Sequence, residues 1–404
     1  MATISRVGGA AMLMPGGALE LTREEALHGE QVARHLRGLI SRAGGWIPFS
    51  TFMQGALYAP GLGYYATGRV LFGAGGDYVT APELSPVFTR CLAHQCVEIL
   101  ARTDGGDVVE FGAGSGRMAF DLLTALERLA ALPQRYRIVE VSAPLRARQQ
   151  ALFAAAPAIA ARVEWLDAPP AENWRGVAIA NEVVDALPVD RFRIAGDGCE
   201  ALGVVVEGDA FRFEPRPADA TLAAAVAALR ARLPNGMPDG YVSEWRASLP
   251  AWIDAAGASL ERGVFLIADY GLPRTHYYHP MRDGGTLCGF YRNRRAEGVL
   301  IRPGLQDLTA WVDFSALCDA AVAAGYTVAG FATQAHALAA LGIEHELAAL
   351  QQEAGERERY RLAQSVQTLM LPGEMGERFK LLALGRGVTG PLAAFSFRDL
   401  SPTL

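Results

Sequence analysis

An apolar run that turns through three alternating glycines constrains the fold more than any other part of the sequence. Residues 108–120 read VVEFGAGSGRMAF, and a helical pattern of leucines and alanines continues to residue 132. Two β-branched residues before Glu110 predict a strand, and glycine can adopt the positive φ angles of a tight strand-to-helix turn. The free N–H groups at the start of the helix favour a bound anion or carbonyl there. A glycine-rich connection without a ligand is the alternative interpretation.

The spacing of these glycines differs from that of the dinucleotide fingerprint. Gly112, Gly114 and Gly116 alternate, whereas G-x-G-x-x-G has its third glycine one residue later. The pattern acid-x-G-x-G-x-G resembles instead the first motif of class I methyltransferases, which bind S-adenosyl-L-methionine. This resemblance implies that the donor binds at Glu110, Gly112, Ala113, Gly114 and Gly116.

Strand-like runs recur between helical patterns along the rest of the chain. Four further runs predict strands: 136–142, 162–167, 176–184 and 263–271. This alternation predicts an α/β fold with a doubly wound, Rossmann-like parallel sheet. Between the last two runs, residues 191–217 alternate apolar and polar positions with Gly-Asp turns, and an alanine-rich helical pattern follows. We therefore predict an inserted antiparallel β plus helix unit at about residues 191–260.

The N-terminal part of the chain predicts an extension to this fold. Residues 1–20 are interpreted as a disordered leader, because their apolar stretch is interrupted by glycines. Thr22 and Glu25 have the spacing of a capping box, which predicts a first helix. The aromatic-rich, Gly/Pro-rich stretch that follows lacks periodicity, and long irregular segments of this kind are usually functional. We predict an extension over 21–105 and a main domain over 106–404.

Charge and cysteine content exclude several classes of protein. A formal net charge of -6 gives no basic footprint for bulk nucleic-acid binding, although RNRR at 292–295 could form a local patch. Five scattered cysteines include no C-x-x-C pair, so neither a disulfide framework nor a metal site is expected, and a cytoplasmic location fits. No uninterrupted apolar run reaches the roughly 18 residues of a membrane span.

Acids follow the second and third predicted strands. Glu140 could accept both ribose hydroxyls of an adenosine, and Asp167 could accept from the adenine amino group. Trp165 or Leu166 could flank the adenine ring. The alternatives are a surface acid at a strand end and a tryptophan that belongs to the core.

The fourth strand ends in polar residues of a different kind. The segment 180–192 reads ANEVVDALPVDRF and contains Asn181, Glu182 and Asp185. Methyl transfer from a sulfonium needs an oriented nucleophile that can lose a proton. Glu182 and Asp185 could clamp an arginine guanidinium by bidentate hydrogen bonds. Alternatively, Asp185 caps a helix and Glu182 supports the glycine turn.

A series of segments resembles the MidA-like family of class I methyltransferases, to which a mitochondrial complex I assembly factor, a protein-arginine methyltransferase, belongs. The segments occur in the family's order at 63–88, 108–123, 136–150, 180–192, 266–271, 303–317 and 374–387. The resemblance implies S-adenosyl-L-methionine as donor and an arginine of a protein, in a respiratory-complex subunit, as acceptor. A small-molecule methyltransferase and a non-catalytic assembly factor are the alternatives, and the sequence leaves the oligomeric state open.

The same resemblance implies roles for residues outside the glycine turn. Residues of the segment GDYVTAPE would fold over the donor: Tyr78, Thr80, Pro82 and Glu83. Donor contacts would also come from Val141, Ser142, Leu166, Asp167, Asn181 and Glu182. Asp269, Tyr270, Gln306 and Asp307 would line the acceptor channel with Glu182 and Asp185. Alternatively, Thr80 to Glu83 cap a helix, and the channel residues are strand-end and turn residues.

Two positions depart from the family's pattern. Asn293 or Arg294 and Trp311 stand where the family often has histidines. If those histidines contact the substrate, the acceptor of this chain differs.

Overall fold

The computed structural model describes residues 21–67 and 80–404. The predicted leader at 1–20 and Tyr78 lie outside the described residues. Within the described chain, no helix combines the length and the apolar character that crossing a membrane requires.

The central sheet is built from the predicted apolar runs. Its strands lie in the order β3–β2–β1–β4–β9–β15–β14, and β13 also pairs with β9. The first five of these strands are parallel, whereas β15 is antiparallel to both of its neighbours. The bounds are β1 Asp107–Phe111, β2 Tyr136–Val139, β3 Val163–Leu166, β4 Trp174–Asn181, β9 Leu260–Leu272, β13 Val312–Asp313, β14 Thr327–Thr333 and β15 Phe379–Arg386. The predicted Rossmann-like α/β fold is confirmed.

Helices cover both faces of this sheet, which explains why its strands are apolar on both sides. Val108 and Val109, adjacent on β1, belong to separate apolar clusters on opposite faces. One face carries α4 Pro86–Arg102, α5 Arg117–Arg128, α12 Gln334–Ala340, α13 Ile343–Glu353, α14 Glu356–Met370 and α15 Met375–Arg378. The other carries α9 Leu249–Gly257 and α11 Phe314–Ala323. Two helices in the crossover from β2 to β3 are α6 Ala143–Phe153 and α7 Pro157–Ala160.

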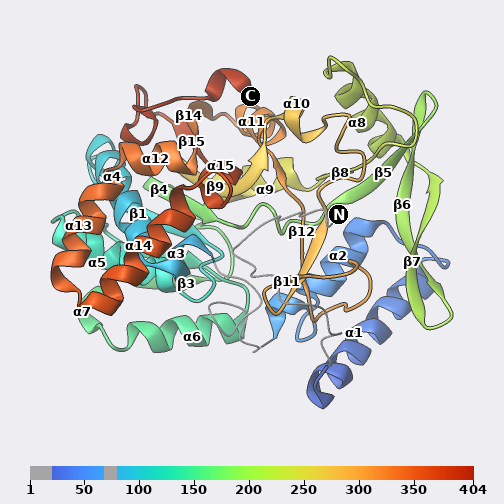
Figure 1. Ribbon diagram of the computed structural model, residues 1–404, viewed down its shortest axis with the longest axis horizontal. Helices are drawn as coiled ribbons and strands as arrows, with labels where there is room; N and C mark the ends of the chain where they lie inside the picture. Colours follow the sequence, from blue (N-terminus) through green and yellow to red (C-terminus); the bar gives the residue numbers. More distant parts are fainter. Residues whose placement is uncertain (1–20, 68–79) are drawn as a thin grey trace.

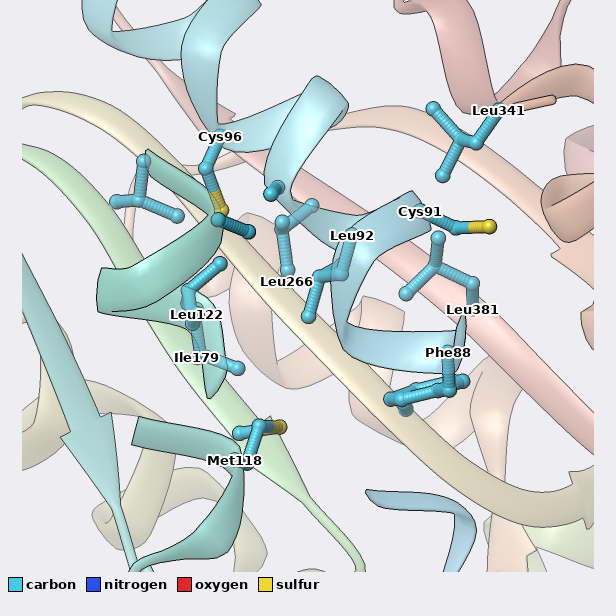
Figure 2. Packing of buried hydrophobic residues seen from close by; sticks show 14 of the residues in the cluster. Phe88, Cys91, Leu92, Cys96, Met118, Leu122, Ile179, Leu266, Leu341 and Leu381 are labelled. Carbon is cyan, nitrogen blue, oxygen red and sulfur yellow. The ribbon is translucent and has the colours of Figure 1, made fainter. Parts of the chain in front are cut away.

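Helix α4 packs directly on the centre of the sheet. Figure 2 shows its side chains Phe88, Leu92 and Cys96 among residues of α5 and of the strands. Ile179 of β4 and Leu266 of β9 are almost fully buried in this cluster. This packing holds the carboxyl ends of β1 and β4 in fixed positions.

The extension as far as residue 66 packs against the predicted insertion, on the side of the molecule away from α13 and α14, whereas its short helix at 81–84 packs on α4 and α5 (Figure 1). The extension contains α1 Arg23–Arg42, α2 Phe49–Tyr58, the 3-10 turn η1 Tyr64–Ala66 and α3 Ala81–Leu84. The insertion is a sheet of order β7–β6–β5–β8 plus α8: β5 Asp190–Ala195, β6 Gly198–Glu207, β7 Ala210–Pro217, α8 Ala220–Ala231 and β8 Val242–Trp245. The capping box of Thr22 and Glu25 is present at the start of α1.

A small three-stranded sheet also forms between β9 and α11, which the sequence did not predict. Its order is β11–β10–β12, with bounds β10 Cys288–Tyr291, β11 Arg294–Arg295 and β12 Asp307–Thr309. The short helix α10 Arg274–Tyr277 precedes it. Through β12, this sheet reaches the end of β4 and brings Thr309 to Asp185.

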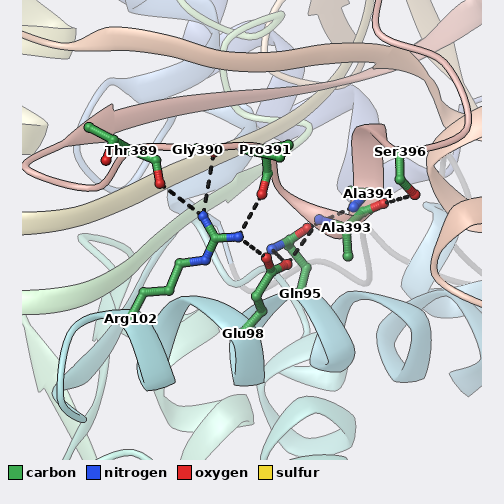
Figure 3. A network of polar contacts seen from close by, with 9 residues as sticks. All are labelled: Gln95, Glu98, Arg102, Thr389, Gly390, Pro391, Ala393, Ala394 and Ser396. Atoms are coloured by element: carbon green, nitrogen blue, oxygen red, sulfur yellow. Dashed lines mark hydrogen bonds and ion pairs between the residues drawn. The ribbon is translucent and has the colours of Figure 1, made fainter.

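The C-terminal segment after β15 is fastened to α4 by polar contacts (Figure 3). Arg102 donates to the carbonyl oxygens of Thr389 at 3.1 Å and Pro391 at 2.6 Å. Gln95 and Glu98 accept the backbone N–H groups at the start of η2 Ala393–Phe395, each at 2.9 Å. The last turn is η3 Ser401–Thr403. These contacts close the molecule on the face of the sheet opposite α9.

Candidate active site at the carboxyl edge of the sheet

A cavity of about 750 Å³ lies where β1, β2 and β4 end. This is the edge at which ligands bind in open α/β sheets, and the volume suits a small-molecule ligand. Residues of the extension around Tyr58 and Tyr65 form the opposite wall. The predicted donor residues that line the cavity are Thr80, Pro82, Glu83, Glu110, Gly112, Ala113, Gly114, Glu140, Val141, Ser142, Asn181 and Glu182.

The three glycines of the turn all have left-handed backbone angles. Their φ values are +65° at Gly112, +54° at Gly114 and +82° at Gly116. An added Cβ at Gly112 would lie 3.1 Å from Val183, and one at Gly116 would lie 3.0 Å from Gln149. Gly116 is the N-cap of α5 and does not line the cavity, so its predicted ligand contact is corrected to a packing role.

Glu140 follows β2 with its side chain directed into the site. The residue is buried, and its two carboxylate oxygens accept from the Ser142 N–H at 2.8 Å and from Gln149 Nε2 at 3.2 Å. Burial raises the pKa of this carboxyl, and those two hydrogen bonds oppose the rise. Val141 beside it is 76% exposed, which leaves apolar surface that a flat ring could cover.

Glu110 is the most buried acid of the cavity, with 1% of its surface exposed. Burial raises the pKa of Glu110 to about 7, although the Tyr136 hydroxyl donates to it at 2.6 Å. A carboxyl here carries much less charge at neutral pH than a surface glutamate does.

The end of the extension is tied to the glycine turn and to Glu182. The Ser115 hydroxyl donates to Glu83, and the Ala81 N–H lies 3.4 Å from Glu182 Oε1. Thr80 precedes α3 without a side-chain capping bond, and Ser85 caps α4 instead. The alternative in which Thr80 caps the long helix is therefore wrong.

Glu182 has an unusual backbone for a non-glycine residue. Its φ is +52°, a left-handed conformation that costs free energy and often marks functional sites. Burial raises the pKa of Glu182 to about 8, and the nearby Asp185 carboxylate adds to this rise. Asn181 Nδ2 lies 3.4 Å from Glu182 Oε1. Within the described residues no hydrogen bond involves Oε2, which leaves that oxygen for a ligand.

Asp185 lies behind this wall and does not line the cavity. Its Oδ2 accepts from Thr309 at 2.7 Å and from the Tyr270 hydroxyl, and burial raises its pKa. Its Oδ1 is buried with no hydrogen-bond partner among the described residues. No helix begins at Asp185, so the helix-cap alternative is wrong, and direct contact with an acceptor is corrected to a place behind Glu182.

Asp269 supports the loop that carries Glu182 and does not face the cavity. It is fully buried, and its carboxylate accepts from the N–H groups of Val184 at 3.0 Å and Asp185 at 3.2 Å. Burial, with the neighbouring Asp185, raises the pKa of Asp269 well above its usual range. Tyr270 likewise points to Asp185, which corrects the prediction that Asp269 and Tyr270 line a channel.

Two predicted adenine contacts also lie outside the cavity. Asp167 is exposed and pairs with Arg146, and Leu166 is not on the cavity wall. The Trp165 indole donates to Gln149 at 3.0 Å rather than facing the cavity. These side chains lie at the end of β3, which β2 separates from β1 and its glycine turn.

The remaining acceptor predictions are distributed around the cavity's rim and beyond it. Asp307 accepts from the hydroxyl of Tyr65, a cavity residue, at 2.7 Å, whereas Gln306 is fully buried. Trp311 is not on the cavity wall, and the guanidinium carbon of Arg282 lies over its ring, 5.0 Å from the ring centre. Asn293 lies in the turn between β10 and β11 with a φ of +58°, and Arg294 is the first residue of β11.

Sequence reasoning missed several residues of the site. Tyr58 and Tyr65 line the cavity with their ring centres 5.5 Å apart, and the Tyr58 hydroxyl donates to the Ala186 carbonyl at 3.0 Å. Trp252 of α9 also lines it. The aromatic content of the irregular segment was the available signal, but it did not indicate which rings face the sheet.

Comparison with known proteins agrees with this arrangement. The family described as "Putative S-adenosyl-L-methionine-dependent methyltransferase" matches residues 91–332. The mouse protein arginine methyltransferase NDUFAF7, mitochondrial, is 31% identical over 395 residues, covering 89% of this chain and 86% of its own. A Caenorhabditis elegans homologue of the same name is 28% identical, covering 85% and 84%.

A solved structure is similar over nearly the whole chain. A Burkholderia thailandensis protein with bound S-adenosyl-homocysteine is 42% identical, with a TM-score of 0.88, and covers 97% of this chain and all of its own. S-adenosyl-L-methionine as the cofactor is therefore supported on grounds independent of the cavity.

Proposed function

Since the chain belongs to this family of S-adenosyl-L-methionine-dependent methyltransferases, we propose that it methylates an arginine side chain of a protein substrate and that its own Glu182 binds this arginine. The names of the mouse and nematode relatives support arginine as the acceptor. The cavity supports it independently, because a carboxylate beside the donor site suits a cationic nucleophile.

The residues around the glycine turn fit the donor. Gly112 and Gly114 let the backbone approach a ligand without side chains in the way, and Glu140 offers a free lone pair on each oxygen for the ribose hydroxyls. Val141 offers an exposed apolar surface for the adenine. When bound, S-adenosyl-L-methionine supplies a methyl group on a sulfonium, and S-adenosyl-homocysteine is left after the methyl carbon bonds to the acceptor nitrogen.

The observation that carries the proposal is the left-handed backbone of Glu182. That conformation turns the side chain into the cavity at the end of β4, and Asp269 holds the loop in place through two N–H groups. Glu182 Oε1 is close to Ala81 and Asn181, so Oε2 is available to accept from a guanidinium N–H. Its carboxylate would orient one nitrogen and hold the proton that this nitrogen loses on methylation.

The acidic network behind Glu182 would strengthen its pull on a cation. Burial, with the Asp185 charge behind it, raises the pKa of Glu182 to about 8, and an arriving guanidinium would exchange a proton on this carboxyl for an ion pair. A neutral acceptor would gain much less from this exchange.

The resemblance to the MidA-like family supports a respiratory-complex subunit as the substrate protein and a role in complex I assembly. Five unpaired cysteines fit a reducing, cytoplasmic setting.

The test is to incubate the purified protein with methyl-labelled donor and lysate of its own host, and to locate the label by mass spectrometry. We expect label on an arginine of a protein. Label confined to small molecules would replace the proposal with a small-molecule methyltransferase. Donor binding without any methyl transfer to lysates from several growth conditions of the host would indicate a non-catalytic protein.

A further inference from the structure

Gln149 of α6 connects three separate parts of the donor site. Its side chain is fully buried, and Nε2 donates to the Gly114 carbonyl at 3.0 Å and to Glu140 Oε2 at 3.2 Å. Its Oε1 accepts from the indole Nε1 of Trp165 at 3.0 Å. One amide therefore bonds to the glycine turn, to the acid after β2 and to β3.

The Trp165 indole determines which way this amide faces. An indole N–H can only donate, so it pairs with the amide oxygen. The amide nitrogen must then face Gly114 and Glu140, which both present acceptors at those positions. The reversed amide would set an oxygen against a carbonyl and a carboxylate, an arrangement with unpaired buried groups.

We propose that Gln149, oriented by Trp165, is a positioning residue that directs the Glu140 carboxylate at the ribose of the donor. The proposal rests on the donor site assigned under the proposed function. The Ser142 N–H holds Glu140 Oε1 at 2.8 Å, and Gln149 holds Oε2. The carboxylate is thus fixed at both oxygens, and each keeps a lone pair for a hydroxyl.

The charges around Glu140 predict how loss of Gln149 would act. Burial raises the pKa of Glu140, whereas the bonds from Ser142 and Gln149 and the positive charge of Arg146 lower it. The nearby acid on β1 is Glu110, whose own pKa is raised by burial and by the charge of Glu140. Removing the Gln149 bond leaves the effect of burial less opposed, so the pKa of Glu140 rises further.

The test uses Gln149→Met, which keeps the length of the side chain and removes its hydrogen bonds. The Kd for S-adenosyl-homocysteine, measured by calorimetry, should rise roughly tenfold, as for loss of a bond to a charged group. Trp165→Phe should raise it about threefold. The double variant should bind as Gln149→Met does, because Trp165 acts through Gln149. Gln150→Met, on the exposed side of the same helix, is the matched control and should leave the Kd unchanged.

A pH profile separates positioning from packing. In Gln149→Met the fall in donor affinity on acidification should begin at higher pH than in the parent, whereas lost packing alone would leave that pH unchanged. An unchanged Kd or an unmoved profile in a folded variant overturns the proposal, and additive effects of the two substitutions overturn the role of Trp165. If Gln149→Met does not fold, the donor Kd of Trp165→Phe tests the proposal instead, and an unchanged Kd overturns it. Glu140→Ala distinguishes failure of the positioning role from failure of the proposed donor site, because unchanged donor affinity in that variant would refute the donor site itself.

Discussion

Glu182→Gln tests the acceptor site with the smallest possible change. Glutamine keeps the shape of the side chain and an oxygen at the position of Oε1, so the contacts with Ala81 and Asn181 can persist. What is lost is the charge that would pair with a guanidinium. Hydrogen bonds to charged groups contribute about 1.5–3 kcal/mol, so kcat/KM for the acceptor should fall by a factor of roughly 10 to 150.

The pH dependence gives the same prediction a second measurement. Because the pKa of Glu182 is raised to about 8, the carboxylate form grows as the pH rises toward that value. With subsaturating acceptor, the parent's kcat/KM should therefore rise between about pH 6 and 8 and level off above. Glu182→Gln should lack this rise.

The assay measures methyl transfer to an acceptor peptide under saturating donor, with the donor Kd measured separately by calorimetry. The donor Kd should change by less than about threefold, since the lost charge acts on the acceptor and the transition state. Glu356→Gln, on an exposed position at the start of α14, is the control and should match the parent. Parent-like transfer by Glu182→Gln would refute the acceptor assignment.

Three further substitutions probe the surrounding structure. Gly114→Val should abolish donor binding by calorimetry in a folded protein, because the new side chain would occupy the ligand's space at the cavity wall and the φ of +54° disfavours valine, and retained binding would exclude this turn as the donor site. Asp269→Leu leaves the N–H groups of Val184 and Asp185 unpaired and should lower the free energy of unfolding by about 2 kcal/mol or more, whereas an unchanged urea midpoint would contradict its supporting role. Glu110 has a folded pKa of about 7 against 4.5, so the folded state binds the extra proton and stability falls as the pH rises from about 5 to 7. Glu110→Gln should remove roughly 2–3 kcal/mol of that fall, measured by urea unfolding at both pH values, and an equal slope in the two proteins would argue against the assignment.

The parallel sheet could be predicted from the sequence because strands covered on both faces are continuous apolar runs. The run ending in Asn181 and the run ending in Tyr270 are of this kind, and they pair in the sheet. The strands of the inserted antiparallel unit alternate with period two, because one face of their sheet packs on α2. The three-stranded sheet of β10, β11 and β12 could not be predicted, because strands of two to four residues are too short for a period.

The predicted site residues lie together where topology alone decides which residues meet. Glu140 and Glu182 follow parallel strands whose carboxyl ends share an edge, so both line the cavity. Asp185 and Tyr270 also follow such strands, but their side chains turn behind the wall to contact Thr309, 124 residues along the chain from Asp185. That direction depends on backbone angles such as the φ of Glu182, which no local pattern indicates.

Gln149 had a signal that sequence reasoning could have used. Leu145, Gln149 and Phe153 are spaced four residues apart and form the buried face of α6. A polar residue in the middle of an apolar helix face needs a buried partner, which often belongs to a site. The sequence does not reveal that the partners are Glu140 and Trp165.

The measurement that tests the central claim most directly is a crystal structure of this protein with S-adenosyl-homocysteine. The account predicts both ribose hydroxyls within hydrogen-bond distance of the Glu140 carboxylate, the amino-acid part beside Gly112 and Gly114, and the sulfur facing Glu182. A nucleoside bound away from Glu140, or a sulfur directed away from Glu182, would contradict it.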